Sequence, residues 1–515
     1  MASKVFSAAI VGFDSQIIEI EADISFGLRS FDIVGLPDKA VEESKERVRI
    51  AIKTCGFKPP LSQAEKILIN LAPADLKKEG ALYDLPIAIA YLLESKKIKF
   101  NEQEKIFTGE LSLDGKLRPI KGALSFALKA KENNFSEIIL PISNAKEAAL
   151  SNSDSDEKRI KIIGAESLQQ VINHIEGKQK IEPFSVNFEE ILEDINYEVN
   201  LDWIRGQGYA KRAAVISAAG GHNLLLLGPP GGGKSLLAKA LPSILPPLSY
   251  KEMLEVTKIY SIAGLLSNKS PIINQRPFRT AHHSSSRASI VGGGVPLKPG
   301  EITLAHRGVL FLDEFPEFHR DVIESLRQPL EDGIITIMRA TQRLTFPCKF
   351  TLIAAANPCP CGYLNDPIHN CSCTSSQIAK YKRKLSSPII DRIDMTIELP
   401  HVKFEKLASA GEGEETLEKR QKVIIAREIQ KQRFCNYDKN IITNSEMQIP
   451  EIKKYCQVGP AAKNILKNCV DSGQLSARGY HRVLKISRTI ADLEESENIL
   501  TEHINEALMY RLKNH

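Results

Sequence analysis

The feature that most constrains the fold is a glycine-rich segment between two apolar runs. Residues 228–235 read GPPGGGKS, a G-x-x-x-x-G-K-S pattern. The preceding run, residues 223–227 (NLLLL), is strand-like, and residues 236–245 (LLAKALPSIL) are helix-like. A strand, a glycine loop and a helix in this order bring backbone N–H groups and a helix N-terminus to one point, where phosphate groups bind. The predicted phosphate-binding residues are Gly228, Pro229, Pro230, Gly231, Gly232, Gly233, Lys234 and Ser235.

The last two residues of this loop carry side chains suited to a nucleotide and its metal ion. We expect Lys234 to reach the β- and γ-phosphates and Ser235 to hold Mg²⁺. The alternative is a glycine-rich surface turn, and the flanking strand and helix argue against it. The segment therefore predicts a site for ATP and Mg²⁺.

Two further apolar runs end in polar residues that would complete such a site. Residues 308–314 read GVLFLDE, where we expect Asp313 to hold Mg²⁺ through its water shell and Glu314 to polarise the attacking water. Residues 350–358 read FTLIAAANP, where Asn357 is predicted to position the water near the γ-phosphate. The alternatives are a simple strand end for the two acids and a turn-starting asparagine before the proline. The order of the runs along the chain favours the functional interpretation.

Four of the nine cysteines lie within fifteen residues, as two C-x-C pairs. Four thiolates from two short knuckles can form a tetrahedral zinc site, although one residue between the cysteines of a pair is fewer than usual. Free reduced thiols and a redox-sensitive cluster are alternatives, and His369 could replace one ligand. The predicted ligands of a structural Zn²⁺ are Cys359, Cys361, Cys371 and Cys373. The other five cysteines, expected to be apolar fillers, are Cys55, Cys348, Cys435, Cys456 and Cys469.

The composition is that of an ordinary soluble protein with more than one domain. The chain has 515 residues, of which 43% are hydrophobic and 25% charged, and its net charge is +5. This balance neither requires nor excludes DNA, so any DNA contact must come from local basic patches. No apolar run approaches the ~20 residues of a membrane helix, and the N-terminus does not resemble a signal peptide. We therefore expect a cytoplasmic protein without membrane contact.

The pattern of runs predicts an α/β fold in four segments. Residues 1–170 alternate strand-like and helix-like runs, and residues 171–198 are polar and acidic enough to form a linker. Residues 199–400 contain the nucleotide motifs and the cysteine cluster. Residues 401–515 have mostly helical apolar spacing. The expectation is an N-terminal α/β domain, a nucleotide-binding core and a helical C-terminal domain.

Three basic segments are candidates for DNA contact. They are residues 276–294, which are rich in glycine, residues 335–347, which alternate like a hairpin, and the run KYKRK at 380–384. Loops of this kind grip the phosphate backbone in ring-shaped motors. The alternative for each is solvated charge on a surface loop or helix. The arginines concerned are Arg276, Arg279 and Arg287 in the first segment and Arg339 and Arg343 in the second.

The order of the nucleotide motifs resembles that of AAA+ ATPases. Gln207, in the segment IRGQ, is similar to the entry segment of that domain, and residues 387–394 (SPIIDRID) resemble the segment that carries the arginine finger. The resemblance implies that Arg392 reaches into the nucleotide site of a neighbouring subunit and stabilises the transition state. A local ion pair with the aspartate at 391 or 394 is the alternative.

The end of the chain also resembles the AAA+ lid. Residues 479–482 (GYHR) are similar to the lid motif that supplies a second arginine. The resemblance implies this role for Arg482, with Arg478 as a rival. The alternative is a solvated arginine on a helix face.

Longer segments resemble the ComM/YifB family, within the magnesium-chelatase-like branch of AAA+ proteins. They include RPFRTAHHSSSRASIVGGG, KPGEITLAHRGVLFLDEFPEF, AANPCPCGY, GLPDKAVEESKERVRIAI and SARGYHRVLKISRTIADL, so the resemblance covers nearly the whole chain. It implies an ATP-driven motor that binds single-stranded or branched DNA and assembles into a ring, expected to be a hexamer. The implied activity is helicase-like branch migration in DNA recombination during natural transformation.

The N-terminal segment resembles the Lon-protease-like fold, also called ribosomal S5 domain 2-like. In that resemblance Leu82 stands about where the nucleophilic serine would be, and Leu124 where the catalytic lysine would be. Because a Ser–Lys dyad needs both groups, we predict no peptidase activity and expect a binding or assembly scaffold.

Two other functions compete with the DNA motor. One is a chelatase-type motor that remodels a protein partner for Mg²⁺ insertion into a tetrapyrrole, and the core motifs fit it equally. The other is a non-enzymatic ring that uses nucleotide only for assembly. Intact Lys234, Asp313 and Glu314 argue against the latter.

Overall fold

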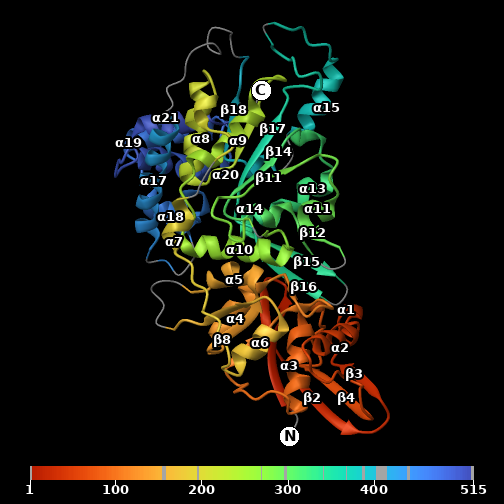
Figure 1. Ribbon diagram of the computed structural model, residues 1–515. Coiled ribbons are helices and arrows are strands. Elements are labelled where there is room, and N and C mark those ends of the chain that lie inside the picture. Colours follow the sequence, from red (N-terminus) through yellow and green to blue (C-terminus); the bar gives the residue numbers. More distant parts are fainter. Residues whose placement is uncertain are drawn as a thin grey trace. The chain divides into compact units, whose positions relative to one another are not determined.

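The chain runs back and forth between two structural units (Figure 1). Unit 1 comprises Met1–Glu193, Ser249–Asn274 and Ala340–Thr345, and unit 2 comprises Asp194–Leu248, Gln275–Arg339 and Phe346–His515. The computed structural model describes residues 3–152, 158–193, 197–267, 269–294, 298–339, 342–366, 368–385, 389–401, 415–435, 437 and 441–511.

Unit 1 is built on a seven-stranded mixed sheet with the strand order β3-β4-β2-β1-β5-β8-β9. The pairs β1–β2 and β2–β4 are antiparallel, and the remaining neighbours are parallel. The strands are β1 (Ser3–Val11), β2 (Asp14–Phe26), β3 (Ser30–Val34), β4 (Glu65–Ala72), β5 (Lys105–Phe107), β8 (Glu137–Pro141) and β9 (Lys161–Ala165). A separate two-stranded ribbon joins β6 (Glu110–Leu111) to β7 (Leu117–Arg118).

Both faces of this sheet are buried at β8, where alternate residues enter two different cores, whereas β3 and β4 alternate buried and exposed residues. Ile139 and Ile163 belong to one core, whereas their neighbours Ile138 and Ile162 belong to the other. Helix α3 packs against β1 and β2, and α4 packs against β2 and β8. The helices are α1 (Lys39–Glu42), α2 (Ser44–Thr54), η1 (Ala81–Tyr83), α3 (Asp84–Glu94), α4 (Ala123–Glu132), α5 (Ile142–Ala149), α6 (Leu168–Ile175) and α7 (Phe188–Glu193).

Helix α10 (Tyr250–Ala263) belongs to unit 1 although it follows the phosphate loop in sequence. It begins with a capping box at Ser249 and packs against α4. The hydroxyl of Ser261 accepts a hydrogen bond from the backbone of Gly122 at 2.9 Å and donates one to the carboxylate of Glu147. Burial raises the pKa of Glu147, although hydrogen bonds from Ser261 and the surrounding backbone oppose that shift. A buried polar contact therefore anchors α10 in unit 1.

Unit 2 contains a five-stranded parallel sheet with the order β11-β14-β17-β10-β18. Every residue of β10, β14 and β17 is buried, as expected of a parallel sheet covered on both faces. Because the strands are parallel, the residues that follow them emerge at one edge, where ligands bind in such folds. The strands are β10 (Leu224–Leu227), β11 (Phe278–Ala281), β14 (Val309–Leu312), β17 (Thr351–Ala356) and β18 (Met395–Glu398).

Helices from distant parts of the chain share one core with this sheet. Helix α8 packs against α9, α17, α20 and β18. The helices are η2 (Leu201–Trp203), α8 (Gly208–Gly220), α9 (Lys234–Ile244), α11 (Arg287–Val291), α12 (Glu301–Leu304), η3 (Phe315–Glu317), α13 (Arg320–Ser325), α14 (Arg327–Asp332), α15 (Ser375–Leu385), η4 (Ile390–Arg392), α17 (Glu415–Phe434), η5 (Asn444–Glu446), α18 (Ile449–Tyr455), α19 (Pro460–Asp471), α20 (Ala477–Leu493) and α21 (Thr501–Met509). Two ribbons pair β12 (Gly292–Gly293) with β13 (Lys298–Pro299) and β15 (Ile334–Arg339) with β16 (Gln342–Pro347).

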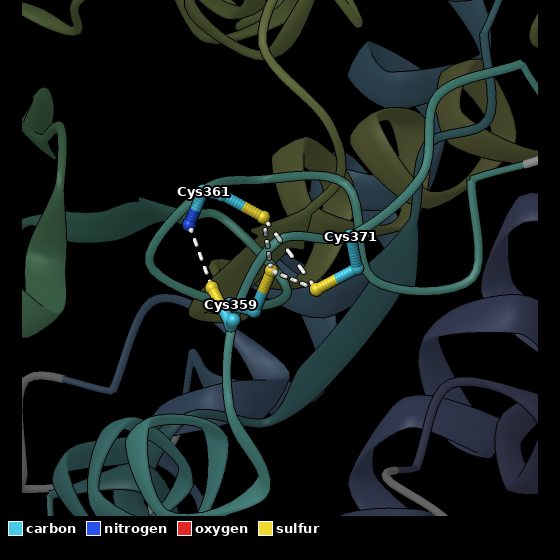
Figure 2. Close-up of side chains that lie close together, drawn as sticks. Cys359, Cys361 and Cys371 are labelled. Atoms are coloured by element: carbon cyan, nitrogen blue, oxygen red, sulfur yellow. Dashed lines mark hydrogen bonds between the residues drawn. The ribbon is translucent and has the colours of Figure 1, made fainter.

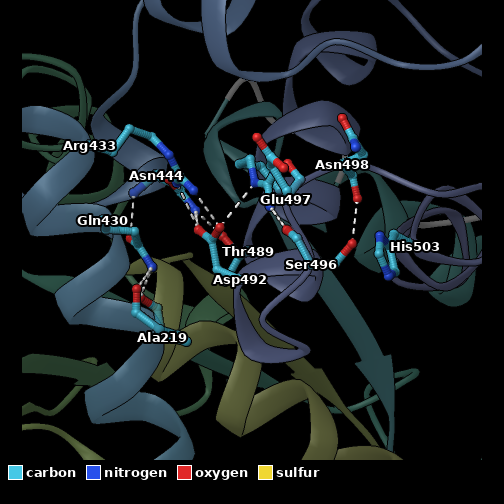
Figure 3. Close-up of polar contacts among 12 residues, drawn as sticks. Ala219, Gln430, Arg433, Asn444, Thr489, Asp492, Ser496, Glu497, Asn498 and His503 are labelled. Carbon is cyan, nitrogen blue, oxygen red and sulfur yellow. Dashed lines mark hydrogen bonds and ion pairs between the residues drawn. The ribbon is translucent and has the colours of Figure 1, made fainter.

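A buried carboxylate ties α17, η5 and α20 together (Figure 3). Both oxygens of Asp492 accept from the guanidinium of Arg433, at 2.5 and 2.8 Å. Asn444 donates to Asp492 at 2.7 Å, and Arg488 donates to the same carboxylate at 3.0 Å. Gln430 extends the network to α8 by donating to the backbone oxygen of Ala219 at 3.0 Å. The C-terminal helices are thus fixed to the first helix of the nucleotide-binding core by polar as well as apolar contacts.

The runs predicted from the sequence are found as regular elements. The strand and helix around the phosphate loop are β10 and α9, the two later apolar runs are β14 and β17, and β15 pairs with β16 in the segment predicted as a hairpin. The boundary predicted at 170/171 differs from the structure, because α6 spans it and buries Val171, Ile172 and Ile175 in the core of unit 1. The first stretch of unit 1 therefore continues to Glu193, well into the segment predicted as a linker.

A few expectations concern residues outside the described ranges. Ser387 and Pro388 of the predicted finger segment belong to these, as does the side chain of Arg339. A helix that could span a bilayer is not found in the part of the chain that the structure describes, since each is too short or too polar.

Candidate nucleotide-binding site

The phosphate loop joins β10 to α9 at the carboxyl edge of the unit 2 sheet. Gly231 and Gly233 have φ angles of +75° and +78°, a left-handed conformation that glycine adopts without strain. Lys234 is the first residue of α9, so the positive end of the helix faces the loop. Gln207, at the start of α8, donates from Nε2 to the backbone oxygen of Gly232 at 2.8 Å. The backbone therefore has the shape that phosphate binding requires.

The ammonium group of Lys234 lies at the centre of the site. Its Nζ atom donates to the backbone oxygens of Gly228 and Pro229 at 2.6 and 2.9 Å, and to Oδ1 of Asn357 at 3.0 Å. Burial lowers the pKa of Lys234, and the charge of Asp313 opposes that shift. The present acceptors are uncharged, so phosphate oxygens would form stronger, charge-assisted bonds with the same group.

Ser235 and Asp313 form a pair of oxygen donors suited to Mg²⁺. The hydroxyl of Ser235 donates to Oδ2 of Asp313 at 2.9 Å, and Oδ1 of Asp313 accepts from the backbone N–H of Glu314 at 2.9 Å. A hydroxyl and a carboxylate beside a phosphate loop match the preference of Mg²⁺ for oxygen ligands, with water and phosphate completing its shell. The donors present therefore fit the predicted ATP and Mg²⁺.

Glu314 is exposed beside this pair and approaches a histidine. Its backbone has a φ angle of +51°, and its carboxylate lies 2.9 Å from Nδ1 of His283. The two residues come together because β11 and β14 are adjacent parallel strands in which Ala281 is opposite Leu312. The contact of His283 with Glu314 was not predicted from the sequence, and only this strand pairing would have indicated it.

Asn357 directly follows β17, the strand between β14 and β10 in the sheet. Its contact with Lys234 brings the third predicted motif to the phosphate loop. Tyr381 of α15 lies against the same residue: burial raises the pKa of Tyr381 to about 12, although a backbone hydrogen bond from Asn357 opposes this. The site thus gathers the ends of β10, β14 and β17, as predicted.

The two arginines assigned by resemblance have partners within unit 2. Arg392 lies at the end of η4 and forms an ion pair with Glu331 at 2.5 Å, rather than with either of the aspartates considered from the sequence. Arg482 lies 3.4 Å from the carboxylate of Asp394, and burial lowers the pKa of its guanidinium against that charge. Arg478, its rival, is exposed.

The four clustered cysteines come together beyond the end of β17 (Figure 2). The sulfur atom of Cys359 lies 3.3 Å from that of Cys361 and 3.7 Å from that of Cys371, and the last two are 3.5 Å apart. Cys373 accepts a hydrogen bond from the backbone of Cys361 at 3.4 Å, and all four sulfur atoms lie within 4.8 Å of one another. His369 is not in this group.

Of the other five cysteines, Cys348 and Cys456 are buried, as expected of apolar fillers. Cys55 and Cys469 are half-buried. Cys435 is exposed, which corrects the expectation, because it follows the last turn of α17.

The thiols of the cluster differ in acidity. The backbone N–H of Tyr363, followed by contacts with neighbouring thiols, lowers the pKa of Cys361 to about 5. The pKa of Cys373 is raised to about 12: a hydrogen bond from the backbone of Cys361 lowers it, but desolvation and the neighbouring thiols outweigh that effect. Negative charge on one sulfur disfavours charge on the next, a penalty that a bound cation would remove.

The basic segments are used in different ways. Arg276 donates to the backbone oxygens of Pro246 and Arg307 at 2.7 and 2.8 Å, and Arg279 forms a two-point ion pair with Glu301. These two therefore have structural partners. The exposed basic side chains are those of Arg287, Arg343, Lys380, Lys382, Arg383 and Lys384.

The parallel sheet with the phosphate loop at its carboxyl edge defines a P-loop ATPase domain of the AAA+ class. Comparison with known families agrees. Residues 200–407 match the family described as magnesium chelatase, subunit ChlI, and residues 413–511 match its C-terminal family. Residues 20–144 match the family described as subunit ChlI of Mg-chelatase.

Relatives match over the full length of the chain. The competence protein ComM of Haemophilus influenzae is 40% identical over 513 residues, which cover 98% of this chain and 97% of that protein. YifB of Escherichia coli is 40% identical over 516 residues, covering 99% and 97%. A Mycobacterium tuberculosis protein is 39% identical over 510 residues, covering 99% and 98%. The chain belongs to the ComM/YifB family of magnesium-chelatase-like AAA+ proteins.

Proposed function

We propose that this protein is an ATP-driven DNA motor. The observation that carries the proposal is the convergence of Lys234, Ser235, Asp313 and Asn357 at one edge of the unit 2 sheet. Lysine, hydroxyl, carboxylate and amide in this arrangement are the groups that phosphoryl transfer to water requires. Because they come from separate strands of a buried sheet, their geometry is held before any nucleotide binds.

In this proposal each side chain has one task. Lys234 would exchange its backbone acceptors for the β- and γ-phosphate oxygens, and Ser235 and Asp313 would hold Mg²⁺, which when bound would supply positive charge to the phosphates. Glu314, which is exposed beside Asp313, polarises the attacking water. Asn357 is in contact with Lys234 and positions that water near the γ-phosphate.

We propose single-stranded or branched DNA as the substrate of the motor. A full-length relative is named a competence protein, and the family resemblance implies DNA recombination during natural transformation. Exposed Arg287, Arg343 and the basic end of α15 offer the charge that phosphate contacts need. Arg276 and Arg279 are not included, because both are half-buried.

The proposed working form is a hexameric ring. Arg392 would exchange its ion pair with Glu331 for the nucleotide of a neighbouring subunit, and Arg482 would act from the C-terminal helices, which we propose form the lid. The N-terminal part of unit 1 is proposed to be a Lon-like scaffold without peptidase activity. Leu82 packs against both cores and Leu124 is buried, so the two positions that the resemblance assigns to a dyad carry neither a hydroxyl nor an amine.

A second candidate is a chelatase-type motor that remodels a protein partner. The match of three chelatase-subunit families to this chain favours it. The ATP site would be the same in both cases. The two candidates therefore differ in what stimulates ATP hydrolysis, not in its chemistry.

The test is ATP hydrolysis by the purified protein alone, with single strands, with duplex and with a four-way junction. We expect single-stranded or branched DNA to stimulate hydrolysis, and Lys234→Ala to reduce it by about a hundredfold or more. Lys239→Ala is the matched control, because Lys239 is exposed on the same helix. Hydrolysis at the same rate with and without each DNA would favour the chelatase-type motor. Absence of hydrolysis would contradict both candidate functions.

A further inference from the structure

The four cysteine sulfur atoms have the spacing of a tetrahedral metal site. A tetrahedron with Zn–S bonds of about 2.3 Å has edges of about 3.8 Å. The sulfur–sulfur distances among Cys359, Cys361 and Cys371 are 3.3–3.7 Å, and Cys373 lies within 4.8 Å of all three. These separations are far longer than the ~2.05 Å of a disulfide bond. Four sulfur donors and no oxygen or nitrogen donor among them favour zinc over Mg²⁺.

Several described residues between the two cysteine pairs make polar contacts. Oδ1 of Asp366 accepts from the backbone N–H groups of Ile368 and His369, both at 2.8 Å. Its second oxygen lies 2.8 Å from Nε2 of His401, just after β18. The rings of Tyr363 and His369 are also in contact. The second pair of cysteines is therefore brought back to the first by a defined turn.

The first pair of cysteines lies directly against the phosphate loop. Gly362 has a φ angle of +87°, and a Cβ atom placed on it would be 2.6 Å from Cδ of Pro230 and 3.8 Å from the amide carbon of Asn357. The segment Cys359–Gly362 thus touches one residue of the phosphate loop and begins two residues after Asn357. A side chain at position 362 would therefore overlap Pro230, so the glycine allows the segment to lie close to the phosphate loop.

The second pair of cysteines leads into α15, which returns to the same site. Helix α15 begins two residues after Cys373 and contacts η3, which follows Glu314. Lys384 pairs with Glu317 of η3 at 3.0 Å. The cysteine cluster therefore joins two segments that border the ATP site from the β17 side and from the β14 side.

We propose that Cys359, Cys361, Cys371 and Cys373 bind one structural Zn²⁺ that holds the phosphate loop and Asn357 in their ATP-binding geometry. The inference rests on the proposed ATP site. The metal closes the loop from residue 359 to residue 373, and its binding free energy stabilises that fold. Without it, Gly362 loses its fixed position against Pro230, and α15 loses its anchor.

The metal site is tested by the zinc content of the purified full-length protein, measured by mass spectrometry after gel filtration. We expect about one zinc per chain. The variant Cys371→Ser/Cys373→Ser should lose the metal, whereas Cys435→Ser should keep it, because Cys435 is exposed and outside the cluster. Metal-free protein with four additional thiols titratable in the native state would overturn the proposal. So would iron with visible absorbance, which would indicate an iron–sulfur cluster.

The proposed dependence of ATP binding on the zinc ion is tested by removing zinc from the wild-type protein. A mercurial reagent displaces the metal, a colorimetric chelator records its release, and binding of a fluorescent ATP analogue is measured before removal, after removal and after reloading. We expect ATP affinity to fall by about tenfold and to return with zinc, while circular dichroism stays unchanged. Unchanged ATP affinity in the stripped protein would overturn the coupling. Zinc content and thiol counts do not depend on ATP or DNA, so they stand even if the proposed motor function fails.

Discussion

At the scale of single residues, the site depends on close backbone contact as much as on charged side chains. In the proposed site, Lys234 and Ser235 would act through polar atoms, whereas Pro230 and Gly362 would act through shape. The Cβ position of Gly362 lies 2.6 Å from Cδ of Pro230, so any larger residue must push the phosphate loop away. The packing of these two uncharged residues therefore supports the position of the groups that are predicted to bind the phosphates.

Gly362→Ala should weaken ATP binding by about tenfold or more, because a small displacement of binding groups has a large effect. The measurement is the Kd for a fluorescent ATP analogue. The matched control is Gly473→Ala, whose φ angle of +74° carries the same backbone strain, but whose Cβ would meet no atom within 4 Å. Equal Kd values for the two variants would show that the contact with Pro230 has no role.

At the scale of elements, α17, η5 and α20 are held by the buried carboxylate of Asp492. It accepts four hydrogen bonds, two from Arg433 and one each from Asn444 and Arg488. Removing one partner of a buried charged network leaves the others without compensation. The stability of the C-terminal helices should therefore depend strongly on this one side chain.

Asp492→Ala should lower the free energy of unfolding of this region by about 3–5 kcal/mol. Chemical denaturation followed by circular dichroism measures the change. Asp471→Ala is the control, because Asp471 is exposed at the end of α19, and it should change the value by only about 0.5 kcal/mol. If both variants lose the same stability, the network does not hold the helices.

Elements also show where sequence reasoning succeeds and where it stops. The apolar runs before Lys234, Asp313 and Asn357 predicted β10, β14 and β17, because local hydrophobic pattern and flanking turn residues define buried strands. The contact between His283 and Glu314 was not predicted. It arises from the pairing of β11 with β14, and partners across a sheet leave no local signal in the sequence.

Long-range packing explains the other differences. Helix α10 was assigned with the nucleotide-binding core by its place in the chain, but Ser261 buries its hydroxyl against Glu147 of unit 1. The zinc prediction named the four cysteines from their spacing alone. That the neighbouring Gly362 lies close to Pro230 is known only from the structure. Patterns along the chain thus named the predicted site residues, and only packing showed which residues surround them.

At the scale of the whole molecule, the proposed ring is tested by whether Arg392 acts on another chain. Arg392→Ala and Lys234→Ala should each lose ATP hydrolysis alone. When the two variants are mixed, part of the ATP hydrolysis should return. In a mixed ring, the intact nucleotide site of an Arg392→Ala subunit can lie beside the intact Arg392 of a Lys234→Ala subunit. Arg320→Ala is the control, because its side chain is 88% exposed.

The mixing experiment has a clear contrary outcome. If Arg392 serves only its ion pair with Glu331, Glu331→Ala should be as damaging as Arg392→Ala, and mixing should recover nothing. That result would assign the arginine to the fold of one chain and remove it from the proposed ring mechanism.

The route of the chain between the units has a consequence for synthesis on the ribosome. Unit 1 needs α10 and residues up to 345, so it cannot be completed when residue 193 has been made. At about 5–20 residues per second, the 70 residues from 194 to 263 delay α10 by roughly 4–14 s. During that interval the surface of α4 that receives α10 stays uncovered, and the nascent N-terminal half exposes it to chaperones and proteases while the phosphate loop is still being made.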